Sequence, residues 1–128
     1  MTPKQFHALV LSFPETVEAQ HYGYPSYKAF GKFLVRLRAE DDSIVLGLED
    51  FDERDMLLEA EPETFHITDH YRSFPYVLAR LKQMDAKRLR GYLTRRWRKN
   101  APKTWLRKWD AEQAAAEGGR GTGKARIR

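Results

Sequence analysis

The sequence contains no cysteine, which excludes a disulfide framework, a thiolate metal site and a cysteine nucleophile. It also has no apolar run close to the roughly 20 residues that a membrane-spanning helix needs. The N-terminal segment MTPKQFHALVLSF does not show the basic-then-apolar order of a signal peptide. These absences favour a cytoplasmic protein without a membrane partner.

Hydrophobic residues make up 41% of the 128 residues, which is enough for one globular domain with a buried core. A stripe from Phe6 to Phe13 follows the helical period, and Thr2 and Gln5 before it have the spacing of a capping box. These patterns predict a first helix that Pro14 ends.

Alternating side chains predict an antiparallel sheet in the next part of the chain. Residues 33–39 and 43–49 each place apolar side chains on one face, and the polar stretch between them makes a turn. Gly31-Lys32 is predicted to form a two-residue hairpin turn just before these segments. Three antiparallel strands are therefore expected, of which the first precedes the hairpin turn.

The second half of the chain adds two helices and further strand. A second helix is predicted to start at Asp52, with Phe51 and Met56 packed as a hydrophobic staple, and to end before Pro62. The other predicted elements are a short strand with a loop in residues 64–74, a strand at 76–82, and a helix from Asp85 to Asn100.

The order helix, strands, helix, strand, helix indicates an α+β fold. We expect an antiparallel sheet of about four to five strands, packed with the N-terminal, middle and C-terminal helices. A cluster of Trp105, Leu106 and Trp109 predicts a short extra C-terminal helix, which Thr104 caps and Gly118 stops.

Four short motifs occur in an order that resembles the MmcQ/YjbR family. They are Phe13-Pro14-Glu15, Tyr24-Pro25-Ser26-Tyr27-Lys28, Pro62-Glu63-Thr64-Phe65, and Trp97 followed by Ala101-Pro102-Lys103. The resemblance implies a compact fold like that of the bacterial frataxin homologue, and a DNA-binding role. It covers a family-like domain at 1–103. The predicted helical extension follows at 104–117, and the composition of residues 118–128 predicts a disordered Gly-rich basic tail.

The net charge of +5 conceals an asymmetry between the two halves of the chain. Residues 1–70 carry six Lys and Arg against fourteen Asp and Glu, whereas residues 71–128 carry seventeen against four. Two interpretations remain open. The second half binds a nucleic acid or another acidic partner, or the acidic and basic segments lie side by side and neutralise each other.

DNA binding is the better supported positive hypothesis, because Lys and Arg side chains neutralise phosphates and release counter-ions. Tyr22, Tyr24 and Tyr27 are candidates for stacking on bases, although tyrosines in a half-buried strand usually pack inside. The candidate phosphate-contacting residues lie on the sheet, on the outer side of the last long helix and just after it: Lys28, Arg36, Arg38, Arg80, Arg88, Arg95, Arg98, Lys99 and Lys103.

The alternative is a protein-interaction or self-association module. Its complementary acidic and basic faces, or its C-terminal tryptophans, would then dock another protein or a second copy of the chain. The stretch at residues 95–109 holds all three tryptophans. Trp97 is expected in the core, while Trp105, Leu106 and Trp109 are the candidate partner interface.

No arrangement of residues indicates an enzyme, a metal or a cofactor. His66, Asp69 and His70 are the best candidate metal ligands, but their segment is predicted to be strand and loop. Eleven acidic residues between Glu40 and Glu63 are better explained as the solvated face of a turn and a helix than as a cation site. Residues 118–124 match a phosphate-binding loop, yet no strand leads into them. We therefore expect a non-enzymatic protein without a cofactor.

Overall fold

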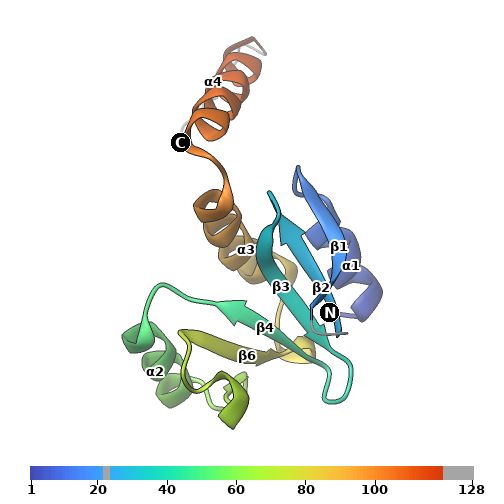
Figure 1. Ribbon diagram of the computed structural model, residues 1–128, viewed down its shortest axis with the longest axis vertical. Helices are drawn as coiled ribbons and strands as arrows, with labels where there is room; N and C mark the ends of the chain where they lie inside the picture. Colours follow the sequence, from blue (N-terminus) through green and yellow to red (C-terminus); the bar gives the residue numbers. More distant parts are fainter. Residues whose placement is uncertain (22–23, 120–128) are drawn as a thin grey trace.

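Six strands form one antiparallel sheet in the order β1-β2-β3-β4-β6-β5 (Figure 1). The structure is a computed structural model that describes residues 1–21 and 24–119. The predicted α+β class is confirmed, but the sheet has six strands instead of four to five. The strands are β1 (Thr16–His21), β2 (Tyr24–Ala29), β3 (Lys32–Arg38), β4 (Ser43–Gly47), β5 (Phe65–His66) and β6 (Tyr76–Arg80).

The edge strand β1 accounts for the difference in strand number, since the short strand β5 lies within the strand and loop predicted for residues 64–74. In β1, Val17, Glu18 and Gln20 are all exposed, so the segment carries no alternation of buried and exposed positions. It forms because its backbone pairs with β2, from Thr16 opposite Ala29 onward. Pairing with a partner strand is not visible in a local pattern.

The hairpin turn between β2 and β3 lies at Phe30 and Gly31, one residue earlier than predicted. Ala29 pairs with Lys32, and φ is 56° at Phe30 and 78° at Gly31. A two-residue turn that matches the strand twist needs positive φ at both central positions, and glycine adopts it without strain. Lys32 is therefore the first residue of β3.

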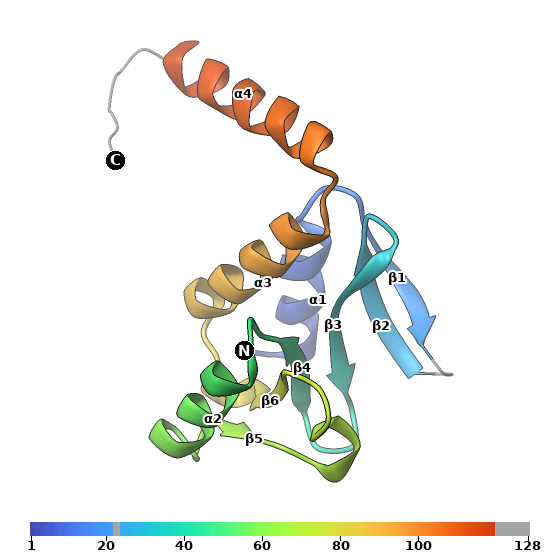
Figure 2. The ribbon, with the colours of Figure 1, turned by 60° about the vertical axis from the view of Figure 1, so that its left-hand side comes forward.

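Helices α1 (Pro3–Leu11) and α3 (Ala86–Asn100) pack on one face of the sheet, and α2 (Phe51–Ala60) lies beside β5 and β6 (Figure 2). The predicted capping box is confirmed, because Thr2 and Gln5 each accept a hydrogen bond from the other's backbone N–H. Local signals at this helix start agree with the tertiary structure.

The start of α2 differs from the prediction. Asp50 caps the helix by accepting a hydrogen bond of 2.8 Å from the Glu53 N–H, so Phe51 is already helical. The side chains of Phe51 and Met56 are 44% and 57% exposed, and the predicted hydrophobic staple is wrong. The helix buries Leu57 instead.

The larger hydrophobic core lies between the sheet and the helices, where Phe6 of α1 and Leu89 of α3 are fully buried. A smaller cluster of Val45, Tyr71 and Leu78 lies on the opposite side of the sheet. Tyr71 reaches it from η1 (Asp69–Tyr71), a 3-10 turn between β5 and β6. We call the side of the sheet opposite α1 and α3 the open face.

Helix α4 (Lys103–Gly119) projects away from the sheet (Figure 2). Its first turn begins with a hydrogen bond of 2.9 Å from the Leu106 N–H to the Pro102 carbonyl, so Thr104 lies inside the helix and is not its cap. The rest of the predicted tail, residues 120–128, lies outside the described residues. Among the helices of the described segments, none combines the length and the apolar character needed to cross a bilayer.

Candidate nucleic-acid interface

Two arginines on the outer side of α3 have carboxylate partners on α2 or next to it. Arg88 donates from its two terminal nitrogens to Glu61, at 2.8 and 2.6 Å. Arg95 Nη1 lies 2.9 Å from Glu53 Oε2. Part of the acidic segment between residues 40 and 63 therefore faces α3 and not the solvent.

A third arginine of α3 pairs with α4. Arg98 and Asp110 form a two-point contact at 3.1 and 2.7 Å. The hydrogen bonds from Arg98 lower the pKa of Asp110, and those from Arg88 lower the pKa of Glu61. Both carboxylates therefore stay ionised at a lower pH than unpaired carboxylates do. On this side of the molecule, the charge asymmetry of the sequence becomes pairing between neighbouring helices.

The predicted arginines of the sheet also have partners. Arg36 is 8% exposed and donates from Nη1 to the Tyr71 hydroxyl. Arg38 Nε lies 3.5 Å from Glu40 Oε2. Arg80 donates from Nη1 to two backbone carbonyls of the loop after α2, at 3.0 and 3.3 Å.

Two other candidates on the sheet, Tyr27 and Lys28, are buried or half-buried. Tyr27 is 5% exposed, its hydroxyl lies 2.8 Å from His7 Nδ1, and its burial raises its pKa. It is part of the core and cannot stack on a base. Lys28 is half-buried in β2. Tyr22 and the side chain of Tyr24 lie outside the described residues.

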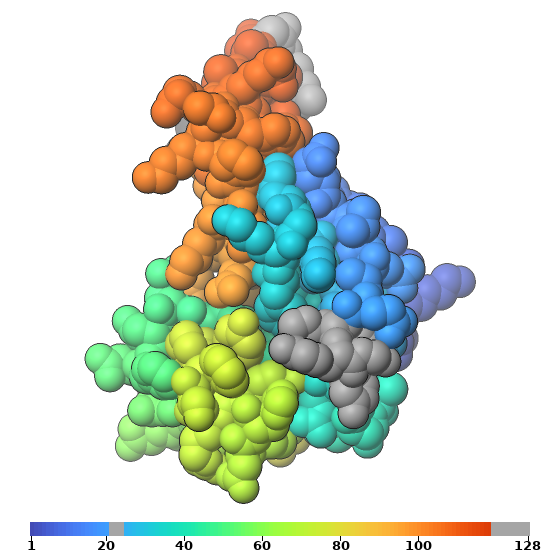
Figure 3. Space-filling view, viewed as in Figure 1, coloured from blue at the N-terminus to red at the C-terminus, as the bar shows by residue number. Residues whose placement is uncertain are grey.

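The last two predicted cations, Lys99 and Lys103, are exposed at the link between α3 and α4. Between them, Asn100 donates from Nδ2 to the carbonyls of Phe33, at 2.9 Å, and Lys32, at 3.3 Å. These bonds hold the β2–β3 hairpin against the end of α3, and Figure 3 shows the hairpin beside the start of α4. We call the exposed cations around this link the junction surface: Lys32, Lys99, Lys103, Arg107 and Lys108.

The junction surface differs from the rest of the predicted set in its charge balance. Within the described residues, its five members make no ion pair, whereas five of the nine predicted cations have a carboxylate within 4 Å. Lys32 was missed as a candidate because it was assigned to a turn. Lys32 belongs to the junction surface because its carbonyl accepts a hydrogen bond from Asn100, 68 positions later in the chain.

The C-terminal tryptophans pack on the domain. The rings of Trp105 and Trp109 are stacked, with 5.6 Å between their centroids. Each ring also contacts Trp97 edge-to-face, with 5.7 Å between the centroids. Trp105 also meets Phe30 of the hairpin at 4.8 Å. Together with Leu106 these rings are half-buried against the main core, so they attach the first turns of α4 to the domain.

An aromatic row on the open face was not predicted. Tyr76 stacks with Phe33 on one side, at 5.6 Å, and with Phe74 on the other, at 5.8 Å. Phe74 is 49% exposed. The guanidinium of Arg96 lies 6.0 Å from the Tyr76 ring. These residues come from β3, β6, α3 and a loop, so no spacing in the sequence could indicate them.

The candidate metal ligands do not converge. His66 Nε2 lies 2.8 Å from the Ser43 hydroxyl, whereas Asp69 pairs with Arg72 at 2.9 Å. His70 packs edge-to-face on Tyr71. No group of three His, Asp or Glu side chains in the described segments is arranged to hold a metal ion.

His66 predicts a pH dependence of stability. Burial, and then the charge of Arg80, lower the pKa of His66 from its ordinary value of 6.5, so the folded protein favours the neutral ring. The unfolded chain takes up the proton more readily, and the free energy of unfolding should fall as the pH drops through 6.5. Urea denaturation between pH 7.5 and 5 should show this decrease, and His66→Gln should flatten it. His70→Gln, at an exposed position, is the matched control; equal slopes in both variants would contradict the assignment.

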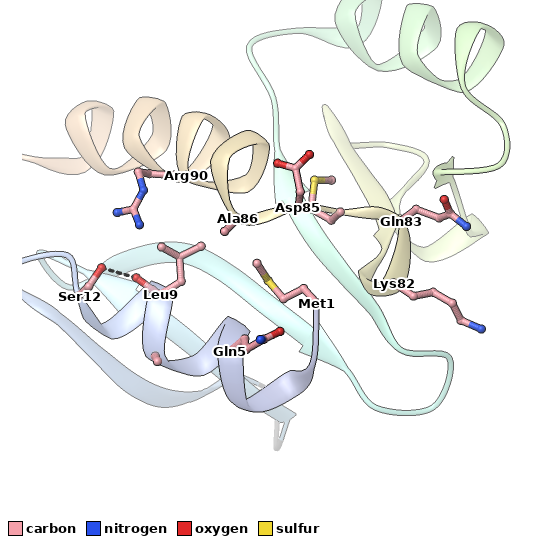
Figure 4. A pocket seen from close by; sticks show the side chains of 11 residues that line it. Met1, Gln5, Leu9, Ser12, Lys82, Gln83, Asp85, Ala86 and Arg90 are labelled. Atoms are coloured by element: carbon pink, nitrogen blue, oxygen red, sulfur yellow. Dashed lines mark hydrogen bonds between the residues drawn. The ribbon is translucent and has the colours of Figure 1, made fainter.

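A hollow of about 710 Å³ lies along α1, between this helix and the segment that leads into the start of α3 (Figure 4). Leu9 and Met84 form part of its apolar lining, and Arg90 lies at its edge. Its single serine, Ser12, donates its hydroxyl proton to the Leu9 carbonyl at 2.6 Å. The described residues that line the hollow include no histidine to act as a base for this serine, so they do not form a nucleophile of the Ser–His type.

These features define a small α+β protein with a six-stranded antiparallel sheet and helices on one face. Where its last two helices meet, it has a basic surface that makes no ion pair within the described part of the chain. The model of the YjbR family matches residues 11–99, well over half of the chain, so the protein belongs to this family. The predicted membership is thereby confirmed. No curated protein and no solved structure gives a significant match to the chain.

Proposed function

We propose that this protein is a non-enzymatic nucleic-acid-binding protein, and that the junction surface contacts the phosphate backbone. The observation that carries the proposal is that five exposed cations gather from the β2–β3 hairpin, the end of α3 and the start of α4, with no carboxylate paired to them in the described residues. Such cations can release counter-ions from a nucleic acid without first breaking an internal ion pair.

The backbone geometry at the junction favours the same ligand. Helix α4 has 17 residues and begins at Lys103, so the positive end of its dipole lies within the junction surface. Four of the five cations are flexible lysines, and the fifth, Arg107, lies in the first turns of α4. Lysine acts as a point charge, which suits contacts to phosphates more than readout of base edges. We therefore expect binding with little sequence preference.

The test compares two double variants that remove the same charge from the full chain. Lys99→Ala with Lys103→Ala removes part of the junction surface, whereas Lys82→Ala with Lys87→Ala removes exposed lysines before and at the start of α3. Fluorescence anisotropy with labelled duplex and single-stranded DNA at several salt concentrations measures both. The junction variant should bind about tenfold more weakly, and its salt slope for duplex DNA should fall by about 2.

The control variant should stay within about twofold of the original protein. Equal losses in the two variants would mean that only net charge matters, and the junction surface would then have no special role. A chain that ends at Gly119 separates the contribution of the basic residues that follow. If this shortened chain no longer binds, the proposal fails.

A further inference from the structure

A second hollow lies on the open face, between β3 and η1, and charged and polar side chains line it. Its volume is about 330 Å³, near the lower end for small-molecule pockets. We call it the open-face pocket; it is lined by Arg36, Arg38, Glu40, Thr68, His70 and Tyr71. None of these residues belongs to the junction surface.

Two guanidinium groups meet at this pocket with little solvent around them. Arg36 and Arg38 project to the same side because side chains alternate along β3. Their side chains are only 10% and 17% exposed. The hydrogen bond from Arg36 to the Tyr71 hydroxyl holds one guanidinium in place. Two positive charges removed from water at one site call for an anion beside them.

Glu40 supplies negative charge at the rim, but its contacts are loose. Its Oε2 lies 3.9 Å from Arg36 Nη2 and 3.5 Å from Arg38 Nε. Charge-assisted hydrogen bonds are shorter, about 2.7–2.9 Å. The Glu40 side chain is also 53% exposed, so it can turn into solvent. Asp41 Oδ1 lies 3.7 Å from Arg38 Nε. The carboxylates compensate the charge without filling the pocket.

A buried hydroxyl adds a donor that the protein itself does not use. Thr68 Oγ1 has no hydrogen-bond partner in the described residues, and it does not cap η1, although Thr68 is the residue before that turn. Buried hydroxyls without a partner are rare in folded proteins, because burial without a hydrogen bond is unfavourable. Since Thr68 lines the open-face pocket, a small local rearrangement brings its buried hydroxyl to a bound ligand.

We propose that the open-face pocket binds the phosphate group of a phosphate monoester, with Arg36 and Arg38 as counter-ions and Thr68 as a hydroxyl donor, once Glu40 has turned outward. A phosphate monoester carries nearly two charges at neutral pH and three acceptor oxygens in a tetrahedral arrangement. That arrangement serves two guanidinium groups and a hydroxyl at once, which a single planar carboxylate does not. The proposal goes beyond the proposed function and uses a different surface.

The first experiment titrates the ¹⁵N-labelled full chain with inorganic phosphate, while sodium chloride keeps the ionic strength constant. Saturable chemical-shift changes are expected at the backbone amides of Arg38, Thr68 and their neighbours. Changes confined to the junction surface, or changes without saturation, would overturn the proposal. A titration with sodium chloride alone measures the chemical-shift changes that salt causes without phosphate.

Three variants then test the roles of the lining residues. Glu40→Gln removes the competing charge and should tighten phosphate binding about threefold, whereas Arg38→Gln should weaken it about tenfold. Thr68→Val should weaken binding about threefold and yet raise the stability of the free protein, since it removes a buried hydroxyl without a partner. A merely structural role of Thr68 would not produce these opposite effects. Unchanged affinity in both Thr68→Val and Arg38→Gln would overturn the proposal, and Thr68→Val keeps the test valid if Arg38→Gln does not fold.

The same phosphate chemistry occurs in free metabolites and at the end of a nucleic-acid strand. Ribose 5-phosphate and a pair of oligonucleotides, with a 5′-phosphate or a 5′-hydroxyl, distinguish the two sources. Tighter binding of the phosphorylated strand that Arg38→Gln abolishes assigns the pocket to strand ends. Equal binding of the two strands, together with Arg38-dependent binding of ribose 5-phosphate, assigns it to small phosphate esters. Variants of Lys99 and Lys103 should weaken the binding of both strands equally and leave the ratio of the two affinities unchanged, so failure here leaves the proposed function standing.

Discussion

Replacing Trp97 by alanine is expected to lower the free energy of unfolding by about 4 kcal/mol, the largest effect of any single substitution considered. Trp97 is 3% exposed, and its Nε1 donates a hydrogen bond of 2.8 Å to the Pro14 carbonyl. Its ring contacts Phe13 and Phe30 at 6.0 and 5.8 Å. One side chain therefore joins α3 to the segment after α1 and to the β2–β3 hairpin.

The same ring also holds α4, so the loss should spread to the C-terminal helix. Trp105 and Trp109 both contact Trp97 edge-to-face, and Trp105 also contacts Phe30. Without Trp97 they have less apolar surface to cover, and α4 should lose protection in hydrogen exchange before the rest of the domain. Denaturation in guanidinium chloride, followed by circular dichroism, measures the global effect.

Two further substitutions separate the contribution of the Trp97 N–H donor from that of the contact with α4. Trp97→Phe keeps an aromatic ring but removes the N–H donor, and it should cost about 1–2 kcal/mol. Trp109→Ala, at a half-buried position on α4, should cost clearly less than Trp97→Ala. If Trp97→Ala and Trp109→Ala had equal effects, Trp97 would not be the central contact between α3 and α4.

Replacing Asn100 by alanine is expected to lower the free energy of unfolding by about 3 kcal/mol, because two backbone carbonyls lose their donor. Asn100 is 5% exposed, so water does not readily replace its amide. The carbonyls belong to Lys32 and Phe33, at the start of β3. The substitution should therefore loosen the hairpin from the end of α3 and also move Lys32 away from the other junction cations.

The measurement is urea denaturation, together with DNA binding under conditions in which the variant is folded. Asn100→Ala should weaken DNA binding about threefold although it removes no charge. Lys99→Ala is the neighbouring control, since it should weaken binding while changing stability by less than about 0.5 kcal/mol. A stability change below this value for Asn100→Ala would show that its two hydrogen bonds do not hold the hairpin.

The starts of α1 and α3 were the parts of the fold that could be predicted best. Thr2 and Asp85 cap α1 and α3 through hydrogen bonds to residues three positions later, so all the groups involved are close in the sequence. The start of α4 was predicted less well, because Thr104 offered a cap that the chain does not use. The backbone carbonyl of Pro102 takes that place.

The candidate site could be predicted only in part. Lys99 and Lys103 were recognised as cations, but so were Arg88 and Arg95, and the sequence contains nothing that distinguishes the two pairs. The distinction arises because α2 packs near α3 and brings Glu61 and Glu53 to the arginines. The open-face pocket could not be predicted either, because Arg38 and Thr68 are 30 positions apart in the sequence and come together only in the folded protein.

The α+β class, the family, most helix boundaries and the burial of Trp97 could be predicted from the sequence, because they depend on periodicity, caps and motifs within a few residues. Three features depend on the folded arrangement: which positive charges are neutralised, which face of the sheet stays open and where the last two tryptophans pack. Ion pairs and aromatic contacts act over a few ångströms in space, and residues far apart in the chain reach that distance only after the strands have paired and the helices have docked.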